Sequence, residues 1–232
     1  MSRNRYPILF VTGTDTEVGK TVISCALLQA FQQHHVIADG FKPLASGAKW
    51  IDGQLRNEDG LALQAYSARR LDYTVVNPNT FEPAIAPHIA SRIAHQSVDI
   101  RLLDGQLEDL VQGSEQVIIE GAGGWQVPLN DRQRFADWVG GHHWPVILVV
   151  GIRLGCINHA LLSAESIRQM GCTLVGWIAN HCQPSTPVLD ENVSYLQVHL
   201  KAPKLGSIGY RTRVDVADIA HDLDISVLLK DD

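Results

Sequence analysis

A glycine-rich loop near the N-terminus carries the strongest chemical signal in the sequence. Residues 13–21 read Gly-Thr-Asp-Thr-Glu-Val-Gly-Lys-Thr, between an apolar run and a stretch free of Gly and Pro. Its glycines let backbone N–H groups turn toward phosphate oxygens, Lys20 can reach β- and γ-phosphates, and the Thr21 hydroxyl can bind Mg²⁺. The two glycines are one residue further apart than in G-x-x-x-x-G-K-[ST], and the alternative is a chance glycine-rich turn. Because the flanking segments have the strand and helix character required, we interpret the loop as a phosphate-binding loop.

A second oxygen ligand for a metal ion is expected at the end of a neighbouring strand. Mg²⁺ prefers oxygen ligands, and phosphate-binding loops place an acid near it. The apolar run 117–119 ends at Glu120, which is followed by Gly-Ala-Gly-Gly. An acid at a strand end means little alone, but beside a phosphate-binding loop it predicts a metal ligand.

The order of apolar runs indicates an α/β fold. Short runs rich in β-branched residues predict buried strands, and patterns with three-to-four spacing, free of internal proline, predict helices between them. Strand then helix, repeated, indicates a mostly parallel sheet with helices on both faces. The expected strands are 8–12, 36–41, 117–120, 146–151 and 175–180, the expected helices are 21–31, 59–67, 99–111 and 157–170, and residues 77–79 and 86–87 are expected in loops.

Composition restricts the classes of function. With 232 residues, 45% of them hydrophobic, we expect one domain spanning residues 1–232. The net charge of −6 and the absence of any Lys/Arg run longer than a pair argue against nucleic acid and anionic membranes as partners. Apolar runs fall far short of the ~20 residues of a membrane helix, which predicts a cytoplasmic protein. Four scattered cysteines and ten histidines without metal-site spacing predict reduced thiols and no structural zinc.

Several segments of the chain together resemble a known family. In the same order and with similar spacing, several segments between residues 8 and 208 resemble dethiobiotin synthetase, including the longer phosphate-binding loop. The resemblance implies a P-loop NTPase-like fold, a homodimer, and ATP, CO₂ and 7,8-diaminononanoate as substrates with Mg²⁺. In the implied reaction, the diamine takes up CO₂ as a carbamate, ATP phosphorylates the carbamate, and the second amine closes a cyclic urea. The segments that carry the resemblance are residues 13–21, 41–47, 56–59, 120–125, 154–160 and 176–180.

The resemblance also implies roles for individual residues. Lys20, Lys42 and Thr16 would act on the carbamate and the transferred phosphoryl group. The alternative for Lys42 is an ordinary surface lysine at a strand end. Thr21, Asp59 and Glu120 would bind Mg²⁺, although Asp59 could also, or instead, cap a helix that begins near Gly60. The implied substrate contacts are Thr16, Lys42, Ser46, Gly155, Cys156, Ile157, Asn158 and Tyr195, the last from the other subunit of the dimer. The implied nucleotide contacts are Glu17, Val18, Gly19, Lys20, Thr21, Val22, Asp59, Glu120, Gly121, Ala122, Gly123, Asn180, His181, Gly209, Tyr210 and Arg211.

One segment departs from the family pattern. Residues 206–209 read Gly-Ser-Ile-Gly, where the family commonly shows Gly-Glu-Ile-Pro, and glycine in place of proline loosens the loop beside the base. Base selectivity can therefore differ from that of the typical enzyme.

Three rival interpretations remain. An amide ligase of the cobyrinate-diamide type would need an added glutaminase domain, for which the chain has no room. A partition-type ATPase switch would carry an extra lysine early in the loop. A P-loop ATPase paralogue of the same fold, with a different or lost substrate, would keep the visible motifs.

Overall fold

A six-stranded parallel sheet forms the centre of the protein. The structure is a computed structural model that describes residues 4–229, so the two ends of the expected 1–232 domain lie outside the described residues. The strand order is β10-β9-β8-β1-β7-β2, and every neighbouring pair is parallel. The strands are β1 (Ile8–Gly13), β2 (Ala38–Phe41), β7 (Gln116–Gly124), β8 (Val146–Ile152), β9 (Leu174–His181) and β10 (Lys204–Ile208).

The strands are apolar on both sides because each face of the sheet has its own core. Along β1, Leu9 and Val11 belong to one buried cluster, and Phe10 between them belongs to the other. All seven residues of β8 are buried. A strand covered on both faces reads as a continuous apolar run rather than an alternating one, and this explains why the expected strands were recognisable. Strand β10 was missed because only Leu205 and Ile208 in it are buried.

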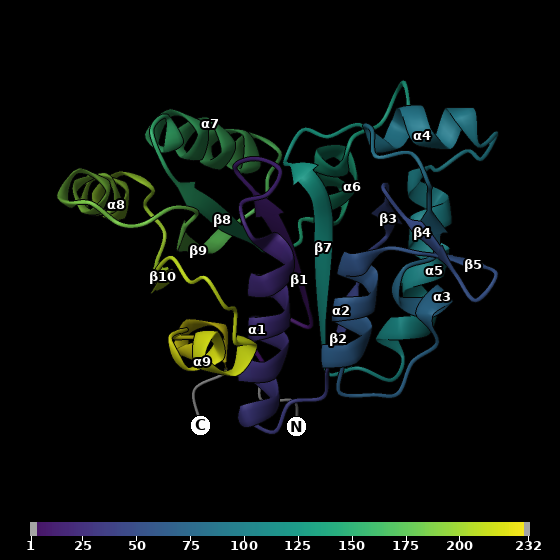
Figure 1. The fold of residues 1–232 in the computed structure, drawn as a ribbon, viewed down its shortest axis with the longest axis horizontal. Coiled ribbons are helices and arrows are strands. Elements are labelled where there is room, and N and C mark those ends of the chain that lie inside the picture. The colour runs from purple at the N-terminus through teal and green to yellow at the C-terminus, as the bar shows by residue number, and fades with distance from the viewer. Residues whose placement is uncertain (1–3, 230–232) are drawn as a thin grey trace.

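Helices cover both faces, which confirms the expected fold class (Figure 1). The first core cluster is closed by α1 (Lys20–Gln33), α2 (Glu58–Tyr66) and α9 (Val216–His221). The second is closed by α5 (Ile100–Val111), α6 (Phe135–His142), α7 (Cys156–Gln169) and α8 (Pro187–His199). In α7, Ala160, Ala164 and Ile167 face the core, and Gly171 follows the helix with φ of 75°. Glycine adopts this left-handed conformation without the strain that a Cβ brings, so it ends the helix.

Short elements lie between β2 and β7, the part of the chain that the sequence described least well. They are β3 (Leu44–Ala45) paired with β6 (Asn79–Thr80), the hairpin β4 (Lys49–Ile51) and β5 (Gln54–Arg56), α3 (Tyr73–Val76) and α4 (Pro87–Ile93). A short 3₁₀ helix, η1 (Ser226–Leu228), lies near the C-terminus. Two expected loops are thus partly wrong. Asn79 begins β6, and Pro87 begins α4, at the first helical position where the missing N–H of proline costs nothing.

The helix cap proposed for Asp59 is also wrong. Helix α2 begins at Glu58, and its N-cap is Asn57, whose side chain accepts hydrogen bonds from the N–H groups of Asp59 and Gly60. Asp59 lies in the first turn, where a carboxylate is favoured by the helix dipole. Its side chain is therefore available for another contact.

The first and last described residues meet, since Asn4 and Leu229 form an antiparallel bridge. Within residues 4–229, no helix combines the length and the apolar character needed to cross a membrane.

The edge strand β2 contains a buried carboxylate, Asp39, which pairs with the segment after α2. Asp39 in β2 is fully buried, and its carboxylate accepts hydrogen bonds from the Arg69 side chain (2.6 Å), the Arg69 backbone N–H (3.0 Å) and the Ser114 hydroxyl (2.8 Å). Beside it, the N–H of Ala68 donates to the carbonyl of Ala38. The segment after α2 therefore covers the edge strand and supplies a counter-charge for Asp39.

We expect Arg69→Ala to lower the free energy of unfolding by about 3 kcal/mol, because it leaves a buried carboxylate without its cation. Urea unfolding measures the change. Arg70→Ala removes the same charge from an exposed neighbour and serves as the control. Equal urea midpoints for the two variants would contradict this role of Arg69.

Candidate active site

The phosphate-binding loop leaves β1 at the carboxyl edge of the sheet. Strands β7 and β2 lie on one side of β1, whereas β8, β9 and β10 lie on the other side. The loop after β1 therefore lies where the strand order reverses. Open α/β sheets place their ligands at this point. Gly19, with φ of 87°, turns the chain into α1, and an added Cβ there would collide with the amide of Asn180. Glycine at this position is thus required by conformation and by space.

Three oxygen-bearing side chains meet beside this loop. The Thr21 hydroxyl lies 2.7 Å from Asp59 Oδ1 and 2.9 Å from Glu120 Oε1. Glu120 is fully buried at its place in β7, and its second oxygen, Oε2, has no hydrogen-bond partner in the described protein. A hydroxyl and two carboxylates, one with an unpartnered oxygen, suit a hard cation such as Mg²⁺. Within the described ranges no group of three His, Cys, Asp or Glu side chains could hold a metal.

Lys42 lies at the centre of this group. Its ammonium is 2.6 Å from Glu120 Oε1, 2.9 Å from Asp59 Oδ2 and 3.3 Å from the carbonyl of Gly121. The residue follows β2 directly and is only 2% exposed. The interpretation of Lys42 as a surface lysine is therefore wrong. A buried ammonium is stable only with such partners, and here two carboxylates supply them.

The charges in the group set one another's protonation. Burial alone lowers the pKa of Lys42, but the carboxylates of Glu120 and Asp59 outweigh burial and the net pKa is raised. Burial alone raises the pKa of Asp59, but the Lys42 ammonium and the Thr21 hydroxyl reverse the effect and the pKa is lowered. Both groups are consequently charged at neutral pH.

Lys20 behaves differently from Lys42. Its ammonium donates to the carbonyl of Asp15 at 3.0 Å and has no carboxylate within salt-bridge distance among the described residues. Burial, followed by repulsion from Lys42, lowers the pKa of Lys20 to about 8. An anionic ligand would supply the missing counter-charge, as expected of a lysine that binds phosphate.

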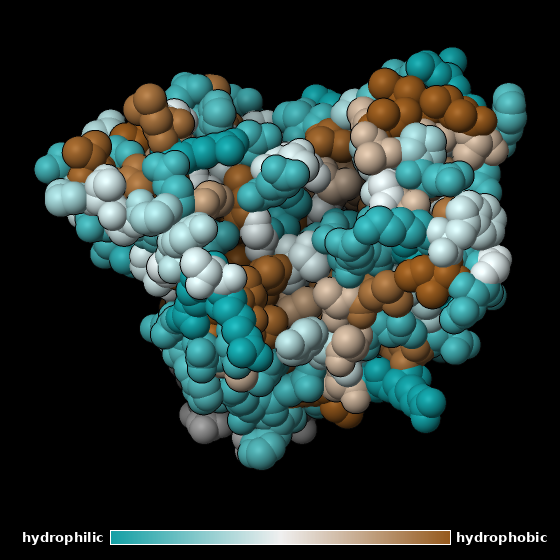
Figure 2. Space-filling view, viewed as in Figure 1, coloured by the Kyte–Doolittle hydropathy of each residue, from teal (hydrophilic) through white to brown (hydrophobic). Residues whose placement is uncertain are grey.

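A cavity of about 410 Å³ opens over these groups. In Figure 2 the surface is hollowed between the side that carries α7 and the side that carries α4. The cavity brings together residues from four separate parts of the chain, including most of the expected phosphate, metal and diamine contacts. Its lining contains Thr16, Glu17, Gly19, Lys20, Thr21, Val22, Lys42, Ser46, Asp59, Glu120, Ala122 and Gly123 from the expected set, together with Ala45 and Asn57.

A second cavity, of about 240 Å³, shares Glu17, Gly19 and Val22 with the first. The Asn180 amide lines it and donates to the carbonyl of Val18 at 2.8 Å, which ties the end of β9 to the phosphate-binding loop. Val18 itself is buried in the core, and an added Cβ at Gly121 would meet the Phe10 ring. Neither of these two expected nucleotide residues lines one of the two cavities. The remaining lining is His181, Cys182, Ile208, Gly209, Tyr210, Arg211, Val214 and Ile219.

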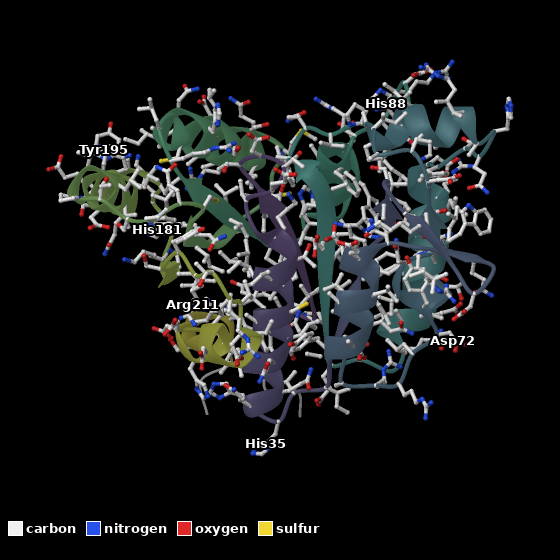
Figure 3. The ribbon with its side chains drawn as sticks, viewed as in Figure 1. His35, Asp72, His88, His181, Tyr195 and Arg211 are labelled. Atoms are coloured by element: carbon white, nitrogen blue, oxygen red, sulfur yellow. The ribbon has the colours of Figure 1, made fainter. Side chains whose placement is uncertain are left out.

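Two expected substrate elements lie outside both cavities. Residues 155–158 form the start of α7, where Gly155 is the N-cap with φ of 91° and the N–H of Cys156 donates to the carbonyl of Arg153. Tyr195 is exposed on α8 and stacks on His199. Figure 3 shows Tyr195 far out on α8, apart from His181 and Arg211, which line the second cavity. The chain does not bring Tyr195 to its own phosphate site.

Sequence reasoning missed several residues. Asn57 holds the wall of the first cavity by donating to the carbonyl of Ser46 (3.1 Å) and by capping α2. An Asn directly before a helix is a capping signal and could have identified it. Cys182, Ile208, Val214 and Ile219 had no local signal, because only the fold brings their strand ends and α9 together.

The sequence and structure were compared with known proteins. The family model described as "AAA domain" matches residues 8–218. A protein of Yersinia pestis bv. Antiqua named ATP-dependent dethiobiotin synthetase BioD is 46% identical, with 94% of each chain covered. A protein of the same name from Pseudescherichia vulneris is 48% identical, covering 94% of this chain and 92% of its own.

The chain belongs to the dethiobiotin synthetase family. Among solved structures, a ParA family ATPase of Chlorobium tepidum (TM-score 0.53, 11% identity, 90% of this chain and 86% of that one) and the cell division protein MinD of Aquifex aeolicus (TM-score 0.53, 15% identity, 92% and 86%) share its fold. At these identities the likeness concerns the fold alone.

The low pKa of Lys20 makes a prediction about proton uptake. At about pH 8.5 a large part of Lys20 is neutral in the free protein, and bound phosphates would raise its pKa and draw a proton from solution. Lys42, with its raised pKa, stays protonated and takes up none. We therefore expect the heat of ATP binding at about pH 8.5 to depend on the ionisation enthalpy of the buffer. The guanidinium of Lys20→Arg does not titrate, so this variant should show no such dependence. Buffer-independent heat for the unsubstituted protein would contradict the assignment.

Proposed function

We propose that this protein is an ATP-dependent enzyme that carboxylates 7,8-diaminononanoate with CO₂ and closes the ring to give dethiobiotin, ADP and phosphate. The observation that carries the proposal is the position of Lys42, a buried cation outside the phosphate-binding loop that points into the same cavity. A simple P-loop ATPase holds its nucleotide without such a group. The names of relatives at 46–48% identity point in the same direction.

The proposed reaction must bring two anions together, a carbamate formed from the substrate and the triphosphate of ATP. One amine of the substrate bonds to the carbon of CO₂ and loses a proton, which gives a carbamate. A carbamate oxygen then attacks the γ-phosphorus, and the bond from phosphorus to the ADP oxygen breaks. Lys20 and Lys42 both line the cavity, and their positive charges would lower the repulsion during this approach.

Ring closure completes the reaction in the same cavity. The second amine attacks the carbonyl carbon of the carbamoyl phosphate and loses a proton, the bond from carbon to the phosphate oxygen breaks, and phosphate leaves. Thr16 in the phosphate-binding loop and Ser46 directly after β3 also line the cavity, and their hydroxyls would hold the diamine and the transferred group. Holding both amines near one carbon replaces a collision with an internal reaction.

Mg²⁺ is part of the proposal. Thr21, Asp59 and Glu120 would hold it, and when bound it would neutralise charge on the β- and γ-phosphates. The unpartnered Oε2 of Glu120 supports this assignment.

The test of the proposed function is product formation. Purified protein incubated with 7,8-diaminononanoate, bicarbonate, ATP and Mg²⁺ should yield a cyclic urea of the mass of dethiobiotin, together with ADP and phosphate. Binding of ATP without any cyclic urea would favour the alternative, a P-loop ATPase paralogue with a different or lost substrate.

The role of Lys42 can be separated from that of the loop. We expect Lys42→Ala to lower diamine-dependent turnover by a factor on the order of 10² or more, the size of effect seen when an enzyme loses one preorganised donor to the transition state. ATP affinity should change much less. Lys42→Gln, neutral but able to donate a hydrogen bond, should lie between wild type and alanine if hydrogen bonding contributes beyond charge.

Phosphate release and ATP affinity are the measurements, and thermal unfolding shows whether each variant is folded. Lys49→Ala, which removes an exposed lysine close in sequence, is the matched control. Equal turnover in wild type and Lys42→Ala would mean that the mechanism is misassigned.

We also propose that the protein is a homodimer. Large apolar side chains are exposed on α7, on α8 and on the loop before α7, seen as brown areas over these helices in Figure 2. Several exposed apolar side chains on neighbouring helices support a surface that a partner covers, and a second copy there could bring Tyr195 to a neighbouring site. The side chains are Leu154 (95% exposed), Leu162 (57%), Val188 (66%), Tyr195 (44%) and Val198 (72%).

Light scattering should therefore return a dimer for the wild type, and Leu162→Glu should shift it toward monomer by placing a charge in the interface. Tyr195→Ala should leave the dimer intact but raise the KM for the diamine. A wild type that is monomeric at working concentration would contradict both expectations.

A further inference from the structure

A carboxylate stands in a loop built to bind phosphates. The Asp15 side chain accepts a hydrogen bond from the N–H of Thr16 at 2.8 Å through Oδ1, and its backbone carbonyl accepts from the Lys20 ammonium at 3.0 Å. Asp15 therefore fixes the shape of the loop tip at Thr16. Its negative charge, however, is next to a place where a triphosphate would bind, and like charges repel.

The second carboxylate oxygen of Asp15 is paired with Arg153, whose guanidinium Nη2 donates to Oδ2. Sequence reasoning singled out neither residue for a role in chemistry, and neither side chain lines the two cavities. Both are partly exposed, at 46% and 42% of the side chain.

The fold brings the two residues together across neighbouring strands. Arg153 lies in the short loop between β8 and α7, and β8 pairs with β1 in register Gly13 to Val149. Backbone contacts hold the two loops side by side, since the Thr14 N–H donates to the carbonyl of Val149 and the Gly151 N–H to the Thr14 hydroxyl. The ion pair therefore connects two segments that are already held in place.

We propose that Arg153 is a positioning residue for ATP binding. By pairing with Asp15 it neutralises the carboxylate that holds the Thr16 peptide, so the loop keeps its shape without repelling the triphosphate. The Arg153 carbonyl also accepts a hydrogen bond from the N–H of Cys156, so the same residue links the phosphate-binding loop to the start of α7, where the family resemblance implies substrate contacts.

The test is a double-variant cycle on ATP affinity, measured by calorimetry with Mg²⁺ and without diamine. Arg153→Ala should weaken ATP binding about tenfold at low salt, because an unpaired Asp15 charge then acts on the phosphates. The loss should shrink to about threefold or less at high salt, since the two charges are partly exposed and screened. Asp15→Asn keeps an oxygen for Thr16 but carries no charge, so adding Arg153→Ala to it should cost less than about threefold. Arg153→Lys should stay close to wild type.

Arg101→Ala, an exposed arginine on α5, is the charge-matched control and should leave ATP affinity unchanged. Circular dichroism monitors folding, and Arg153→Gln replaces Arg153→Ala in the cycle if the latter does not fold.

The inference is overturned if Arg153→Ala binds ATP as the control does, if its loss is the same in the Asp15→Asn background, or if salt does not reduce the loss. Because the inference rests on the ATP binding of the proposed function, a wild type that does not bind ATP overturns both, whereas the other outcomes overturn the inference alone.

Discussion

The site depends on the burial of one carboxylate. Glu120 is fully enclosed at the centre of the sheet, where an isolated charge would be severely destabilised. Its Oε1 receives the Lys42 ammonium and the Thr21 hydroxyl, and Asp59 shares both partners. Three distant parts of the chain, after β2, at the start of α1 and in α2, must therefore meet at β7. The fold must therefore bring these partners to Glu120, because the buried carboxylate is stable only when they are in place.

This arrangement gives the two lysines of the site different properties. Lys42 has two carboxylate partners and a raised pKa, whereas Lys20 has a carbonyl partner and a pKa lowered to about 8. The first is a fixed charge, and the second lacks a counter-anion until one binds. In the reaction that we propose, the fixed cation would orient the attacking carbamate while the loop lysine responds to the nucleotide.

Carboxylates beside the phosphate-binding loop are paired with cations in the same way. The carboxylate of Asp15, after β1, pairs with Arg153, after β8, and the carboxylates of Glu120 in β7 and Asp59 in α2 pair with Lys42, after β2. Carboxylates near a phosphate site are tolerated because each is matched by a cation from another strand end. A parallel sheet makes this possible, since all its carboxyl ends lie at one edge.

The sequence by itself determined the class of fold, the phosphate-binding loop and the family. Continuous apolar runs mark strands that are buried on both faces, so five of the six central strands were found within two residues at their starts. The loop, Lys20, Thr21 and Glu120 were found because local spacing alone defines them. The family resemblance then supplied Lys42, Ser46 and Asp59, which no local pattern identifies.

Only the tertiary structure decided how these residues act together. It showed Lys42 buried between two carboxylates, Asn57 rather than Asp59 as the cap of α2, and Arg153 paired with Asp15. The contacts of Lys42 with Glu120 and of Arg153 with Asp15 join residues 78 and 138 positions apart. The cap of α2 is local, but the hydrogen bond of Asn57 to the carbonyl of Ser46 spans 11 positions. Local propensity and periodicity do not extend over such distances. The pKa values of the two lysines follow from the same contacts, because protonation is set by burial and by the charges that the fold brings within a few ångströms.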